Sequence, residues 1–143
     1  MPQDQASGDA GRLFGNECGR RLLELISATR GAGRSNECVW EARRAGVKCA
    51  QLKSTPNPTI GALADMLERI EVVVAAFQVE GQEFEVHWMS ADDYVRHSRL
   101  KKAGEKRTKD QRMMNRSVFV RNGQKFKAVR FDPPLQSVTQ GAV

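Results

Sequence analysis

The longest uninterrupted apolar segment of the chain is Val72-Val73-Val74-Ala75-Ala76-Phe77, which is rich in β-branched residues. Its length suits a buried strand, whereas a membrane-spanning helix needs roughly 18 apolar residues in a row. The segment therefore predicts a core strand and excludes a protein with transmembrane helices. The chain has 143 residues, of which 40% are apolar, so we expect one domain, or one small domain with an appendage.

The residues around this segment predict a β-hairpin followed by a short helix. Residues 72–79 and 83–89 are rich in β-branched and aromatic side chains, and the loop between them contains Gly81. Ser90 is a suitable N-cap for a helix over 91–100, because Asp92 and Asp93 then lie in the first turn, where the helix dipole favours acids.

The N-terminal half predicts helices. Residues 1–11 contain little to bury and read as a disordered lead-in, and a helix follows from Arg12. A second helix is expected over 36–45, at most two turns over 47–55, and a further helix from Pro58 to about Ile70. Apolar residues of these helices recur at three and four positions and should form one core: Leu22, Leu25, Ile26, Ile60, Leu63 and Leu67.

The C-terminal part predicts a second hairpin. Residues 101–116 have little to bury and read as a mobile basic connector or an exposed helix. Residues 118–131 read as two strands around Asn122-Gly123, the dipeptide typical of a type I′ turn. The predicted fold class is α+β, with a helical, helix-turn-helix-like subdomain over 12–70, two hairpins with a short helix and the connector over 71–131, and a loose tail over 132–143.

Charge is segregated along the chain. Residues 57–95 carry one basic and eight acidic residues, whereas residues 96–130 carry thirteen basic and two acidic residues. A block with a net charge of +11 attracts polyanions, and counterion release makes such binding depend on salt. A solvated face that binds the acidic segment, or binds nothing, is the alternative explanation.

The sequence predicts no catalytic site, metal site or cofactor. His87 and His97 lie far apart, without metal-ligand spacing to a Cys, Asp or Glu, and are expected to be exposed. Three cysteines without C-x-x-C spacing favour a reducing compartment, and the N-terminus lacks a secretory pattern, so we expect a cytoplasmic protein.

Three segments resemble the phage-repressor-type (Xre-like) helix-turn-helix family. They are Gly19-Arg-Arg-Leu-Leu-Glu-Leu25, Asn36-Glu-Cys-Val-Trp-Glu-Ala-Arg-Arg-Ala-Gly46-Val47 and Asn57-Pro-Thr-Ile-Gly-Ala-Leu-Ala-Asp-Met-Leu67. The resemblance covers residues 19–72 and implies a DNA-reading helix between Gly46 and Asn57. That interval is about one helical turn shorter than is usual in the family, which implies weakened base reading.

The leading hypothesis is a small DNA-binding protein, a transcriptional regulator from a phage, plasmid or other mobile element. DNA is favoured over RNA, because the phenylalanines of 118–131 are too few for a stacking platform. The protein is not expected to bind a membrane, and whether it forms a homodimer is left open. The alternative is an inhibitor or antitoxin that docks on a nucleic-acid-handling machine without reading DNA. The residues expected to contact nucleic acid are Lys48, Gln51, Lys53, Lys101, Lys102, Lys106, Arg107, Lys109, Arg112, Arg116, Lys125 and Lys127.

Overall fold

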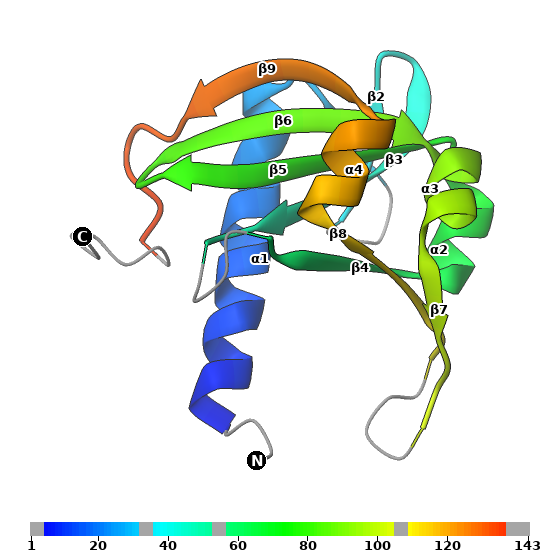
Figure 1. The fold of residues 1–143 in the computed structure, drawn as a ribbon. Helices are drawn as coiled ribbons and strands as arrows, with labels where there is room; N and C mark the ends of the chain where they lie inside the picture. The colour runs from blue at the N-terminus through cyan, green and yellow to red at the C-terminus, as the bar shows by residue number, and fades with distance from the viewer. Residues whose placement is uncertain (1–4, 32–35, 53–56, 105–108, 137–143) are drawn as a thin grey trace.

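The computed structural model describes residues 5–31, 36–52, 57–104 and 109–136, and within them the protein is predominantly β (Figure 1). Nine strands form a six-stranded sheet with the order β1-β2-β3-β5-β6-β9 and a three-stranded sheet with the order β4-β8-β7. The elements are α1 (Gln5–Leu25), β1 (Thr29–Arg30), β2 (Glu37–Trp40), β3 (Arg43–Ala50), β4 (Thr59–Leu63), α2 (Ala64–Arg69), β5 (Val72–Glu80), β6 (Glu83–Ser90), α3 (Ala91–His97), β7 (Arg99–Lys101), β8 (Gln111–Asn115), α4 (Arg116–Asn122) and β9 (Gln124–Arg130).

The apolar segment is confirmed as the centre of the structure. In β5, every residue from Val72 to Phe77 is fully buried. This strand pairs in parallel with β3 and antiparallel with β6, and the β3-to-β5 crossover contains β4 and α2. Both faces of the large sheet are covered, which explains why β5 is apolar throughout rather than alternating.

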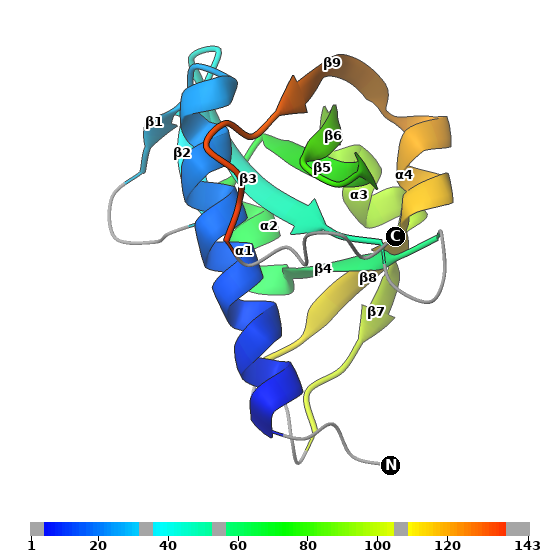
Figure 2. The ribbon, with the colours of Figure 1, turned by 90° about the vertical axis from the view of Figure 1, so that its left-hand side faces the viewer.

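One face of the large sheet packs against α1. Phe14, Cys18, Leu22 and Ile26 of the N-terminal segment join the apolar cluster of that face, and Figure 2 shows α1 running alongside β2 and β3. The sheet is curved enough to bring Trp40 of β2 within 5.1 Å of Phe126 of β9, measured between ring centroids.

The opposite face packs against the three-stranded sheet and the helices α2, α3 and α4. Its apolar cluster includes Ile60, Leu67, Tyr94 and Phe119. The apolar residues expected in one core are therefore divided between two, because the large sheet separates Leu22 and Ile26 from Ile60 and Leu67.

The expected helical subdomain over 12–70 is wrong. Residues 37–50 form the antiparallel strands β2 and β3, joined by the two-residue turn Glu41-Ala42. Both turn residues have positive φ, 51° and 64°, as a type I′ turn requires. The sequence hides this hairpin, because neither residue is the Asn or Gly that such a turn favours. The helix expected from Pro58 is also wrong at its start, where β4 precedes the short helix α2.

The expected hairpin over 118–131 is wrong as well. Residues 116–122 form α4, and Asn122-Gly123 ends this helix instead of turning two strands. The Asn122 side chain donates from Nδ2 to the carbonyl of Val118 at 2.8 Å. Strand β9 then pairs antiparallel with β6 and forms an edge of the six-stranded sheet. The expectation of a mobile basic connector or exposed helix over 101–116 is also wrong, because this segment contains the end of β7 and all of β8.

The hairpin expected over 72–89 is confirmed. The helix expected over 91–100 is confirmed at its start, but α3 ends at His97, and Arg99 and Leu100 belong to β7. Strands β5 and β6 pair antiparallel around Gly81, whose φ is +53°. Ser90 caps α3 by accepting a hydrogen bond from the Asp93 amide at 3.0 Å. The tail is less loose than expected, because Leu135 is fully buried and its amide donates to the Gln82 side chain at 2.7 Å. Among the described residues, no helix is long and apolar enough to cross a membrane.

Candidate nucleic-acid interface

The described cations of the basic block are spread over α3, β7, β8, α4 and β9. Strand β7 is an edge of the three-stranded sheet, and β9 is an edge of the six-stranded sheet; α4 lies between β8 and β9 along the chain (Figure 1). The block therefore forms no single footprint. The groups around the cations differ from one part to the next.

The first part is the β7–β8 ribbon, formed by Arg99–Lys101 paired with Gln111–Asn115. Strand β8 also pairs with β4 on its other side, so this ribbon is the outer part of the three-stranded sheet. It projects away from the six-stranded sheet (Figure 1), and all three residues of β7 are exposed. Because side chains alternate along a strand, Arg99 and Lys101 lie on the same face of the sheet. Their cross-strand partners on β8 are Met113 and Gln111. Within the described part of the chain, no ion pair links Arg99, Lys101 or the exposed Lys102 to a carboxylate.

The ribbon is attached to the core by buried groups. Met114 of β8 is buried, and the Tyr94 hydroxyl of α3 donates to the carbonyl of Arg112 at 2.8 Å. Asn115 accepts from Arg99 Nη1 at 3.0 Å, which links the two strands. The ribbon thus presents its cations from a fixed base.

Arg112 and Arg116 contact the protein itself. Arg112 Nη1 lies 3.5 Å from the carbonyl of Val95 and from the Ser98 hydroxyl. Arg116 Nη1 donates to the carbonyl of Gln78 at 3.0 Å, and its guanidinium lies over the Phe77 ring, 5.7 Å from the centroid. Both side chains hold elements together, so the structure gives them internal roles.

The cations of β9 face carboxylates of β6. Lys125 Nζ lies 3.8 Å from Glu85 Oε2, and Arg130 Nη1 lies 3.1 Å from Glu83 Oε1. Lys127 Nζ lies over the Phe126 ring, 5.5 Å from its centroid. Lys125 and Lys127, which were expected to contact nucleic acid, therefore lie on a strand paired to the sheet, and part of the charge of this strand is offset locally.

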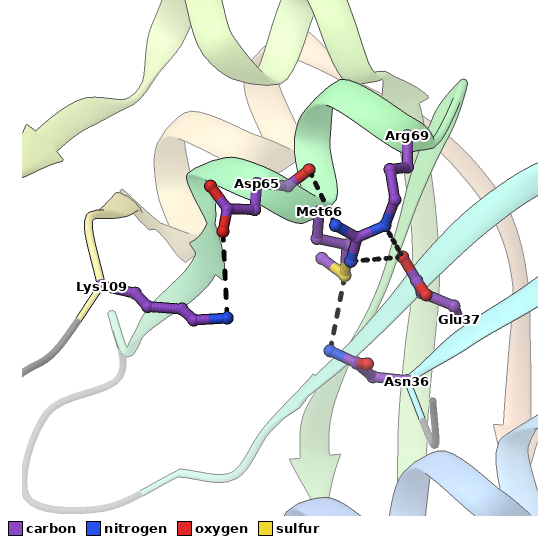
Figure 3. Close-up of polar contacts among 6 residues, drawn as sticks. All are labelled: Asn36, Glu37, Asp65, Met66, Arg69 and Lys109. Carbon is purple, nitrogen blue, oxygen red and sulfur yellow. Dashed lines mark hydrogen bonds and ion pairs between the residues drawn. The ribbon is translucent and has the colours of Figure 1, made fainter. Parts of the chain in front are cut away.

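Lys109 lies near α2, where Figure 3 shows it beside Asp65. The distance from Lys109 Nζ to Asp65 Oδ2 is 3.9 Å, and both side chains are about half exposed, so the pair contributes little. In the same view, Arg69 pairs with Glu37 at 3.0 Å and joins α2 to β2. Lys53, Lys106 and Arg107 lie outside the described residues.

The expected recognition segment is part of a strand. Lys48 lies in β3, and Gln51 is the first residue after the end of this strand, so neither residue is presented on a helix. Lys48 lines a cavity of about 400 Å³ with Thr59 and Gly61 of β4, which is the edge of the three-stranded sheet opposite β7. The structure therefore separates Lys48 and Gln51 from the ribbon. Burial lowers the pKa of the Lys48 amine.

Sequence reasoning missed Arg99 as a site residue. The signal was present, because Arg99-Leu100-Lys101 alternates as an exposed strand does. His87 was expected to be exposed, but it is buried with 4% of its surface accessible. Its Nε2 lies 3.2 Å from Glu85 Oε1, and this contact is the largest cause of a lowered Glu85 pKa.

The described residues contain no group of three or more His, Cys, Asp or Glu side chains placed to hold a metal ion together. No protein-family model, curated protein or solved structure matches the chain.

Proposed function

We propose that the protein binds duplex DNA through the β7–β8 ribbon, with Arg99, Lys101 and Lys102 on phosphate groups. The observation that carries this proposal is the position of three cations on an exposed, projecting ribbon with no carboxylate paired to them among the described residues. Strand β7 is the exposed edge of the three-stranded sheet, so its cations can lie along phosphate groups, and phosphate contacts fix the orientation of a protein on duplex DNA.

Duplex DNA is favoured over RNA for two reasons. The major groove of A-form RNA is too narrow for side chains to enter, so the side chains of an exposed edge strand cannot enter it. Single-stranded RNA is recognised largely by stacking on aromatic rings, but the large apolar side chains exposed in the described structure are all aliphatic. Salt-dependent attachment to the duplex backbone remains the chemistry that these residues support.

The experiment measures fluorescence anisotropy of a labelled random duplex between low and physiological salt. The test variant is Lys101→Gln/Lys102→Gln, and its matched control is Lys125→Gln/Lys127→Gln, which removes the same charge from β9. Because each phosphate contact contributes about 0.9 to the slope of log K against log salt, the test variant should lower the slope by up to roughly 1.8. The control should retain most of the wild-type slope.

Two outcomes would reject the proposal. One is equal weakening by the two variants, which would indicate diffuse charge attraction instead of a ribbon site. The other is no binding by the wild type at about 0.1 M salt and micromolar protein, since non-specific DNA binding usually reaches that range. The protein-docking alternative would then replace it. Comparison of two duplex sequences in the same assay measures whether binding has the preference that a transcriptional regulator needs.

A further inference from the structure

A cavity of about 400 Å³ lies where α1, β3 and β4 meet, outside the proposed DNA-binding ribbon. This volume is within the range for small-molecule sites. Its lining comes from four separate segments: Gly15, Asn16 and Gly19 of α1, Asn36, residues Val47, Lys48 and Cys49 of β3, and residues Thr59, Ile60 and Gly61 of β4. None of these residues is acidic.

Two glycines one turn apart leave the α1 side of the cavity open. A Cβ atom added at Gly15 or Gly19 would meet nothing within 4 Å, so close packing requires neither glycine. Glycine within a helix costs about 1 kcal/mol relative to alanine. The absence of side chains at these positions leaves free volume beside Lys48, although Gly19 itself is buried.

Lys48 supplies the cavity with an amine, which is a cation when it is protonated. Its side chain is partly buried, and within the described residues its amine has no ion-pair or hydrogen-bond partner. Burial lowers the pKa of this amine, and among the described residues Cys49 acts in the opposite direction. An ammonium group removed from water without a counter-ion is unfavourable, and a bound anion would offset that cost.

Neutral hydrogen-bonding groups line the same cavity. Asn16 and Thr59 line the cavity together with Asn36. The Asn36 amide nitrogen has the Met66 sulfur as its partner at 3.4 Å (Figure 3), and a thioether is a weak acceptor. The Asn36 side chain can therefore turn toward a ligand at little cost.

We propose that this cavity binds a small organic anion whose phosphate or carboxylate head contacts the Lys48 ammonium. The neutral amides and the hydroxyl of Asn16, Asn36 and Thr59 complete the hydrogen bonds of the head group. The remainder of the ligand lies along α1 at Gly15 and Gly19, where no side chain fills the cavity.

The test follows backbone amide resonances during titration with three probes: inorganic phosphate, ribose 5-phosphate and succinate, at ionic strength held constant with chloride. A bound probe should shift the amides of Gly15, Gly19, Lys48 and Thr59 and saturate at millimolar concentration or below. Ribose 5-phosphate binding more tightly than succinate assigns a phosphate head, and the reverse order assigns a carboxylate.

Three variants locate the site. Lys48→Gln should weaken binding by about tenfold or more, whereas Lys127→Gln, which removes the same charge from β9, should change it less than about twofold. Gly19→Leu keeps Lys48 and fills the cavity, so it should also abolish binding of ribose 5-phosphate. The proposal is overturned if no probe gives saturable shifts up to about 10 mM, or if both lysine variants weaken binding equally. Persistence of binding in Gly19→Leu would also overturn it. None of these titrations involves DNA, so their outcome is independent of the DNA-binding proposal.

Discussion

The turn between β2 and β3 is strained, and relieving the strain should stabilise the protein. Glu41 and Ala42 both have positive φ, which costs a residue with a Cβ atom about 1–2 kcal/mol. The natural residues for this turn are Asn and Gly. We therefore expect Glu41→Asn/Ala42→Gly to raise the free energy of unfolding.

The size of the effect follows from three contributions. Glycine at position 42 removes the strain, but it also increases the conformational freedom of the unfolded chain, which lowers the gain in stability by roughly 0.5–1 kcal/mol. Asparagine at position 41 tolerates the left-handed region better than glutamate does. The ion pair lost with Glu41 is exposed, with 4.0 Å between Glu41 Oε2 and Arg43 Nη2, and contributes little. The net gain should be about 1 kcal/mol, which corresponds to a rise in Tm of roughly 3–5 °C.

Urea denaturation followed by tryptophan fluorescence is a suitable assay, because Trp40 immediately precedes the turn and contacts Trp88. Glu41→Gln removes the ion pair while leaving the backbone strain, so it measures the ionic contribution alone. Ala42→Val is the opposite perturbation, because a β-branched residue tolerates positive φ poorly, and it should lower stability by about 1 kcal/mol or more. A valine variant as stable as the wild type, or a less stable Asn-Gly variant, would refute the reasoning.

Three further predictions concern the other elements. Gly123→Ala should destabilise the protein by about 1–3 kcal/mol in urea denaturation, because its Cβ would lie 2.8 Å from the Trp88 carbonyl oxygen and 2.9 Å from that of Phe119; unchanged stability would contradict this close approach. Tyr94→Phe should cost about 1–2 kcal/mol by removing the partly buried hydrogen bond to the Arg112 carbonyl, and the amides of β8 should lose protection from hydrogen exchange; unaltered exchange would show that other contacts hold the ribbon. Because the pKa of Glu85 is lowered in the folded protein, Glu85 contributes stability above its ordinary pKa of 4.5, and this stability is lost as the pH falls through the lower pKa of the folded state. The difference in unfolding free energy between the wild type and Glu85→Gln should therefore shrink in acid. A difference that stays constant from pH 6 to pH 3 would exclude this linkage.

The sequence by itself determined the central strand, the hairpin around Gly81 and the Ser90 cap. Each depends on interactions among residues close in the chain: a continuous apolar run, a glycine loop and a hydroxyl three residues before an amide. The charge block was also a property of the sequence, although its distribution over separate elements of the fold was not. Local patterns are sufficient where neighbours along the chain supply the stabilising contacts.

Only the tertiary structure decided which of two similar segments turns and which is helical. Asn122-Gly123 has the composition of a hairpin turn, yet Phe119 is fully buried against Phe77 and Tyr94, which favours a helix there. Glu41-Ala42 has the composition of a helix, yet burying Trp40 and Cys38 on one face of the sheet favours strands. In both segments, burial of large side chains contributes more free energy than a turn preference of about 1 kcal/mol, so contacts distant in the chain override the local pattern.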